Sequence, residues 1–144
     1  MKNYRKITVQ VVSFLLIILW IYAASSKLMN FNMFRQQMSW QMLFPFIKHT
    51  IIYILPAAEV LTAFLLVFER TQRAGLYFSF TMLLAFTIYV GLAVFKFFDH
   101  IPCSCGGILN KMTWNAHFLL NIFFLLLTAL GIYMVYRERG SKRR

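Results

Sequence analysis

Residues 47–68 read IKHTIIYILPAAEVLTAFLLVF, and this stretch decides the fold. It carries few charges and is long enough for one helix to cross the hydrocarbon core of a membrane, which takes about 20 residues. Backbone N–H and C=O groups cannot stay unpaired in lipid, so such a run must be helical. The stretch predicts a membrane-spanning helix with two unusual residues inside it, Pro56 and Glu59.

Three other runs have the same character. None of them alternates with period two, as the strands of a membrane barrel would. The four predicted spans cover about residues 7–24, 47–68, 74–95 and 116–136. The second and third are joined only by a short charged link, Glu69 to Arg73, so we expect them to be antiparallel neighbours. Together they predict one all-α domain over residues 1–144, an integral membrane four-helix bundle.

Composition supports this class of protein. Hydrophobic residues make up 60% of the 144 residues and charged residues 13%, and the mean hydropathy is +0.66. An ordinary soluble domain is about 25% charged, so the lipid bilayer is the expected surrounding. The net charge of +11 does not indicate nucleic acid, because no basic helix or RNA-binding signature accompanies it.

The distribution of basic residues predicts the orientation. Ten lie in segments on the side of the N-terminus: Lys2, Arg5, Lys6, Arg70, Arg73, Arg137, Arg139, Lys142, Arg143 and Arg144. Five lie in the segments on the other side: Lys27, Arg35, Lys48, Lys96 and Lys111. Cytoplasmic loops carry an excess of Lys and Arg, so both termini are expected in the cytoplasm.

The first run has a second interpretation. Residues 1–6 form a basic leader, and Ala23-Ala24-Ser25 resembles the cleavage site of a secretory signal peptide. The apolar run is longer than that of a signal peptide, which usually has about 7–15 residues. We therefore interpret it as a membrane span.

An amphipathic segment follows the first span. Apolar residues recur there at helical spacing and predict a helix that lies at the membrane surface: Leu28, Phe31, Phe34, Met38 and Met42.

The only two cysteines, Cys103 and Cys105, lie one residue apart in the predicted outer loop, about residues 96–115. A disulfide needs Cα atoms about 4.4–6.8 Å apart, so this spacing demands a bent, strained backbone. Strained and exposed disulfides are more oxidising than structural ones, and the outer compartment permits them. The pair indicates thiol–disulfide exchange. A passive clasp or two unpaired thiols is the simpler alternative.

A metal site is another alternative. His100, Cys103, Cys105 and His117 would supply two sulfur and two nitrogen ligands, a set that zinc or copper accepts. The spacing matches no standard zinc finger.

His117 also belongs to a polar face of the fourth span. Trp114, His117 and Asn121 follow at i, i+3 and i+7 and so share one side of a helix. Such a face would activate a thiolate or bind a quinone carbonyl. Hydrogen bonding between helices is the structural alternative.

Glu59 is the most unusual charge, because an acid deep in a span is costly and marks a functional site by default. Pro56 lies three residues earlier and is expected to kink the helix. Lys27, at the outer end of the first span, is the predicted partner of Glu59.

These motifs resemble the MauE/DoxX-like family of redox-associated bacterial membrane proteins. The resemblance is carried by Ser26-Lys27-Leu28 with Phe31, by Pro56-x-x-Glu59, and by Cys103-x-Cys105-Gly106 ahead of His117 and Asn121. Family members are four-helix proteins of the bacterial inner membrane. The namesake is needed for maturation of methylamine dehydrogenase, a protein with many periplasmic disulfides.

The resemblance implies thiol–disulfide exchange beside a periplasmic thioredoxin-like protein or a disulfide-containing client, with Cys103 and Cys105 as catalytic residues. Glu59, Lys27, His117 and Asn121 would form a supporting polar site. The family resemblance does not imply a role in methylamine metabolism. There is a looser similarity to disulfide-forming quinone reductases, but those use two cysteine pairs. No cofactor is certain, and quinone stays open, as does a non-enzymatic assembly subunit.

Overall fold

A computed structural model describes residues 2–39, 44–95 and 114–142. This part of the chain forms helices and no strand, which confirms the predicted all-α class. The helices, in chain order, are α1 Lys2–Met29, α2 Phe31–Ser39, α3 Pro45–Val67, α4 Gln72–Val94 and α5 Trp114–Lys142.

Four of these helices, α1, α3, α4 and α5, are long and apolar enough to cross a membrane, as predicted. The bounds of α3 and α4 agree with the prediction to within two residues. In contrast, α1 is five residues longer than predicted at each end, and α5 continues six residues further. Hydropathy marks the part of a helix that lies in hydrocarbon, whereas the backbone stays helical among polar residues at headgroup level.

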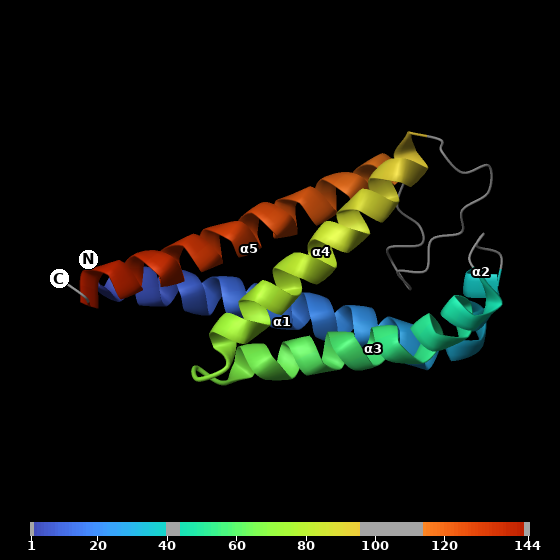
Figure 1. Cartoon of the computed structure of the whole chain (residues 1–144), viewed down its shortest axis with the longest axis horizontal. Helices are drawn as coiled ribbons and strands as arrows, with labels where there is room; N and C mark the ends of the chain where they lie inside the picture. The colour runs from blue at the N-terminus through green and yellow to red at the C-terminus, as the bar shows by residue number, and fades with distance from the viewer. Residues whose placement is uncertain (1, 40–43, 96–113, 143–144) are drawn as a thin grey trace.

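Figure 1 shows how the helices are arranged. The two termini lie together at one end of the bundle, which we call the terminal end. α2, the last turn of α4 and the first turn of α5 lie toward the opposite end, which we call the loop end. α1 packs against α3 and α5, and α4 packs against α5 and α3.

A short turn joins α3 to α4, and Thr71 closes it. Its hydroxyl donates to the carbonyl of Leu65 at 2.8 Å, and its N–H donates to the carbonyl of Phe68 at 3.1 Å. These bonds pair carbonyls that the end of a helix leaves without donors. The adjacent Gln72 donates from Nε2 to Ser13 Oγ at 2.8 Å, which ties the turn to α1. The expected antiparallel arrangement of α3 and α4 is therefore present.

α3 carries a proline at its start and another inside it. Pro45 lies in the first turn, where the missing N–H costs nothing. Pro56 lies within the helix, so the carbonyl of Ile52 lacks its usual helical donor. A groove of about 510 Å³ follows this side of α3, and its lining is hydrophobic or aromatic throughout: Leu28, Phe31, Ile52, Tyr53, Pro56, Ala57, Val60, Leu61 and Phe64.

α2 is the helical part of the predicted amphipathic segment. Its apolar side chains Phe34 and Met38 are buried and pack around Ile52 of α3. The ammonium of Lys48 donates to the carbonyl of Ser39 at 2.8 Å and holds the end of α2 to α3. The apolar face of α2 thus contacts the protein.

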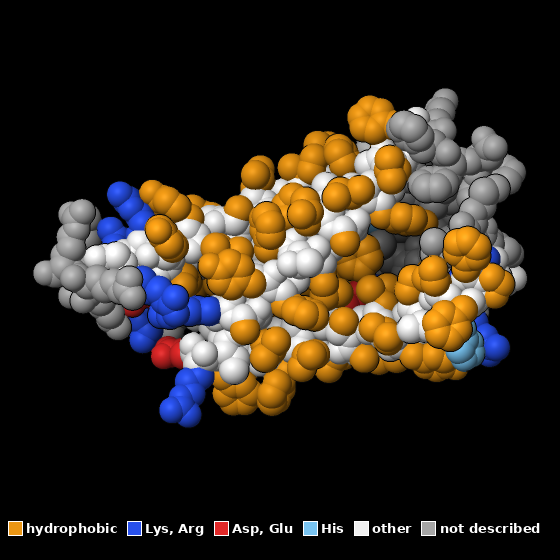
Figure 2. All heavy atoms as spheres, in the orientation of Figure 1, with side chains coloured by type: hydrophobic (Ala, Val, Ile, Leu, Met, Phe, Trp, Pro, Cys, Tyr) orange, Lys and Arg blue, Asp and Glu red, His pale blue; other side chains and the backbone are white. Residues whose placement is uncertain are grey.

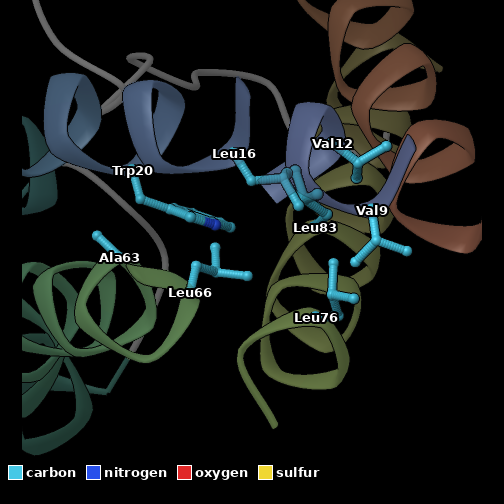
Figure 3. Packing of buried hydrophobic residues seen from close by; sticks show 8 residues of the cluster. All are labelled: Val9, Val12, Leu16, Trp20, Ala63, Leu66, Leu76 and Leu83. Atoms are coloured by element: carbon cyan, nitrogen blue, oxygen red, sulfur yellow. The ribbon is translucent and has the colours of Figure 1, made fainter. Parts of the chain in front are cut away.

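α1, α3 and α4 build the central core, and α1 contributes the most side chains, as Figure 3 shows. α1 contributes four of the core's eight buried residues: Val9, Val12, Leu16, Trp20, Ala63, Leu66, Leu76 and Leu83. The indole of Trp20 donates from Nε1 to Ser79 Oγ at 2.9 Å. A buried indole usually finds such a partner, and this one links α1 to α4.

The outer surface is apolar. Large side chains point away from the core on every spanning helix, among them Phe14, Phe64, Ile88 and Leu126, each more than half exposed. Figure 2 shows hydrophobic side chains over the middle of the molecule, with Lys and Arg most dense at the terminal end. Apolar surface this extensive is what a membrane, and not water, would cover.

Gly75 provides a test of the α3–α4 packing. A Cβ at this position would lie 2.9 Å from Leu66 Cγ and 3.0 Å from its backbone nitrogen. We expect Gly75→Leu to destabilise the protein by about 1–3 kcal/mol, the usual cost of overpacking. The free energy of unfolding is measured by adding a denaturing detergent to the protein in a mild detergent. Gly140→Leu is the control, because nothing lies within 4 Å of a Cβ there. Equal stability of the two variants would contradict this packing.

Candidate functional site

Buried polar side chains in the described residues fall into two groups. The side chains of the first group form hydrogen bonds between helices or within one helix. Ser13 and Ser79 accept from Gln72 and Trp20, as described above. The hydroxyls of Thr62 and Thr128 donate to carbonyls four residues earlier in their own helices. These groups join helices or bond within one helix, and each of their oxygen atoms has a hydrogen-bond partner in the described residues.

The second group contains the four predicted supporting residues, Lys27, Glu59, His117 and Asn121. All four are buried. Lys27 lies in the last turn of α1, and His117 and Asn121 lie in the first two turns of α5. Both of these helix ends are at the loop end. The structure therefore places these polar groups in the half of the bundle away from the termini.

Lys27 and Glu59 form an ion pair between α1 and α3. Lys27 Nζ lies 2.7 Å from Glu59 Oε1, and the two side chains are only 3% and 1% exposed. The same ammonium donates to the carbonyl of Ala23 at 3.4 Å. The partner predicted for Glu59 is thus the one present. Moving a charge out of water costs several kcal/mol, so each charge here is tolerable only because of the other.

This pair is not saturated. An ammonium has three N–H donors, and the contacts of Lys27 in the described residues use two, to Ala23 and Glu59. Among those same residues, Glu59 Oε2 is buried without a hydrogen-bond partner. The ion pair therefore offers one further donor and one further acceptor.

His117 and Asn121 share one side of α5, as the spacing predicts. Both side chains are buried, and they are one helical turn apart. Asn121 Nδ2 is the second buried side-chain atom in the described parts of the chain that lacks a hydrogen-bond partner. A donor left unpaired in the interior costs about 1–3 kcal/mol, so a ligand or water that accepts from it would be held firmly.

The cysteine pair itself lies outside the described residues, as does His100. The prediction that Cys103 and Cys105 react therefore stays a prediction. The same holds for the metal alternative, since three of its four ligands are among these residues. In the described ranges, no three His, Cys, Asp or Glu side chains lie close enough to hold a metal ion.

Sequence reasoning missed the contacts between Ser13 and Gln72 and between Trp20 and Ser79, and the groove beside Pro56. Each contact joins residues 59 positions apart. Hydropathy gives no signal for such pairs, because it does not say which faces of two helices meet. The groove had a weak signal, a proline followed by two alanines inside a span.

Four spanning helices around a buried ion pair define a multi-pass membrane protein with a polar interior toward one end. Comparison with protein families agrees with this class. Residues 5–134 match the family model described as methylamine utilisation protein MauE, and the chain belongs to that family. No curated protein and no solved structure matches the chain.

The ion pair makes a direct prediction about stability. Glu59→Leu leaves the charge of Lys27 buried and unpaired, so we expect it to destabilise the protein by about 3–5 kcal/mol. Adding Lys27→Met should restore most of that loss, because replacing both charges by apolar groups is often neutral. Denaturing-detergent titrations of the single and double variants measure the coupling.

The chain offers a matched control for this cycle. Lys6 and Glu69 form an ion pair of 3.4 Å, but their side chains are 64% and 69% exposed. Lys6→Met with Glu69→Leu should show a coupling of at most about 1 kcal/mol. If the buried pair coupled no more strongly than this exposed pair, Lys27 and Glu59 would not depend on each other.

Proposed function

We propose that this MauE-family protein takes part in thiol–disulfide exchange at the outer face of the bacterial inner membrane, through Cys103 and Cys105. The observation that carries the proposal is topological. Both cysteines of the chain lie in the segment that joins α4 to α5. Those two helix ends lie at the loop end, opposite both termini.

The charges support placing the loop end outside. Lys27, counted from the sequence as an outer basic residue, is buried within α1 and paired with Glu59. Without it, the sequence has four basic residues in the segments on the cysteine side of the spans, against ten in the segments on the side of the N-terminus. The larger excess favours termini in the cytoplasm. The cysteines would then face a compartment in which disulfides persist.

The proposed reaction is exchange through a mixed disulfide. A thiolate of the partner attacks one sulfur of the Cys103–Cys105 disulfide, and the other cysteine leaves as a thiolate. A second partner thiolate then attacks the mixed disulfide. The partner gains a disulfide, and Cys103 and Cys105 are left as two thiols. The suitable partner is a thioredoxin-like protein or a client that matures by disulfide formation.

The four buried polar residues would act in support of this exchange. His117 lies in the first turn of α5, twelve residues after Cys105. A nearby cationic imidazole stabilises a cysteine thiolate, and a more stable thiolate leaves a disulfide faster, which would accelerate the exchange.

Topology can be tested in intact cells. We expect a membrane-impermeant maleimide to label Cys103 or Cys105 from outside after mild reduction. The control is Arg139→Cys in a chain that also carries Cys103→Ser and Cys105→Ser, since Arg139 is exposed near the end of α5. It should label only after the cells are opened. The reverse pattern would place the cysteines in the cytoplasm and contradict the proposal.

Exchange can be tested by trapping the partner. In Cys103→Ser or Cys105→Ser, the remaining thiol can still form a disulfide with an oxidised partner but lacks the neighbouring thiol that would displace that partner. One of these variants should therefore accumulate an adduct that reducing agent releases. Mass spectrometry of the adduct identifies the partner. The variant with both substitutions is the control and should give none. If neither single variant formed an adduct and both thiols of the wild type stayed free in cells, exchange would not be the function.

A further inference from the structure

The Lys27–Glu59 pair has a hydrogen-bonding pattern that its structural role does not explain. Two buried charges satisfy each other with one bond, from Lys27 Nζ to Glu59 Oε1. What remains is a donor on Lys27 and an acceptor on Glu59 Oε2. Both belong to one ion pair, so together they fit an oxygen that accepts in one state and donates in another.

The surroundings restrict the ligand further. Glu59 lies fourteen residues after the start of α3, or about 21 Å along the helix at 1.5 Å per residue. A charged headgroup or a nucleotide would have to be desolvated at high cost to reach this depth. The ligand must therefore be uncharged and soluble in the membrane.

We propose that the Lys27–Glu59 pair binds one ring oxygen of a lipid-soluble quinone, and that Asn121 Nδ2 donates to the other. A quinone carbonyl accepts a hydrogen bond, and the free N–H of Lys27 supplies it. A quinol hydroxyl also donates, and Glu59 Oε2 accepts. The ion pair thus serves both redox states. Asn121 Nδ2, buried and unpaired at the same end of the bundle, suits the second oxygen in either state.

The quinone site depends on the proposed function in one respect only: the thiols of Cys103 and Cys105 are the electron donor to the quinone. Disulfide donation to a partner leaves Cys103 and Cys105 as two thiols. Their oxidation reforms the S–S bond and releases two electrons and two protons. One quinone takes up both electrons and both protons and becomes a quinol, so the step balances. The pair would then be oxidised again and ready for another partner.

Binding is measured on the purified full-length protein in detergent with decylubiquinone and decylubiquinol, by isothermal titration calorimetry. We expect saturable binding of both. Glu59→Gln is the discriminating variant. Because it leaves Lys27 without a counter-charge, its helix content and its unfolding in the same detergent are first compared with those of the wild type, and binding is measured only on folded protein. Its amide oxygen can still accept from Lys27, but the group in place of Oε2 becomes an N–H donor. The quinol should then bind about tenfold more weakly, while the affinity for the quinone changes by less than about threefold.

Two further variants complete the test. Asn121→Leu removes the second donor and should weaken both ligands roughly three- to tenfold, the value of one hydrogen bond. Thr128→Val is the control, because Thr128 is buried on the same helix and bonds only within it. It should bind as the wild type does. Absence of saturable binding by the wild type, equal weakening of quinone and quinol by Glu59→Gln, or unchanged binding by Asn121→Leu would each overturn the proposal.

The cysteines separate this inference from the proposed function. The variant with Cys103→Ser and Cys105→Ser should bind the quinone normally but should not reduce it. If the wild type trapped a partner but bound no quinone, the quinone site would be overturned and the exchange function would stand. If the wild type bound quinone but its reduced thiols never converted it to quinol, the site would stand and the assigned electron donor would be wrong.

Discussion

The bundle depends on the desolvation of one lysine and one glutamate. Each side chain is almost completely buried, and the attraction between the two charges offsets the cost of removing each of them from water. Because the two atoms must lie within hydrogen-bonding distance, the pair fixes how far α1 and α3 are shifted along each other. Apolar side chains define this register much less sharply, since dispersion contacts tolerate small displacements. The shift of α3 along α1 therefore depends on the charge of Glu59 as much as on the packing of apolar side chains.

The remaining polar groups divide the interior by purpose. Trp20–Ser79 and Gln72–Ser13 link α1 to α4 and to the α3–α4 turn. Every side-chain atom that forms these links has at least one hydrogen-bond partner. In the described residues, Glu59 Oε2 and Asn121 Nδ2 have none. Natural interiors pair nearly all buried polar groups. Glu59 Oε2 and Asn121 Nδ2, the two exceptions in the described residues, are therefore the atoms at which a further partner would be bound.

The sequence predicts the fold well because hydrocarbon imposes a strict length and composition on whatever crosses it. The four spans, the short link after Phe68 and the pairing of Glu59 with Lys27 all follow from this constraint. The helix ends do not, because α1 and α5 continue through residues that are polar and still helical. The contacts of Trp20 and Ser13 were also out of reach, since periodicity identifies a buried face but not its neighbour. The count of basic residues places Lys27 in an outer segment because charge alone suggests exposure, whereas its long side chain turns inward to Glu59.

The order in which the chain is made gives the ion pair a second consequence. α1 leaves the ribosome before α3, with Lys27 only two residues from its end. A lysine near a helix end can extend its ammonium to the headgroups, so α1 can enter the bilayer without its partner. Glu59 follows 32 residues later, and only then can the ammonium turn inward. Helices insert before they associate, so formation of this pair separates an inserted chain from an assembled one.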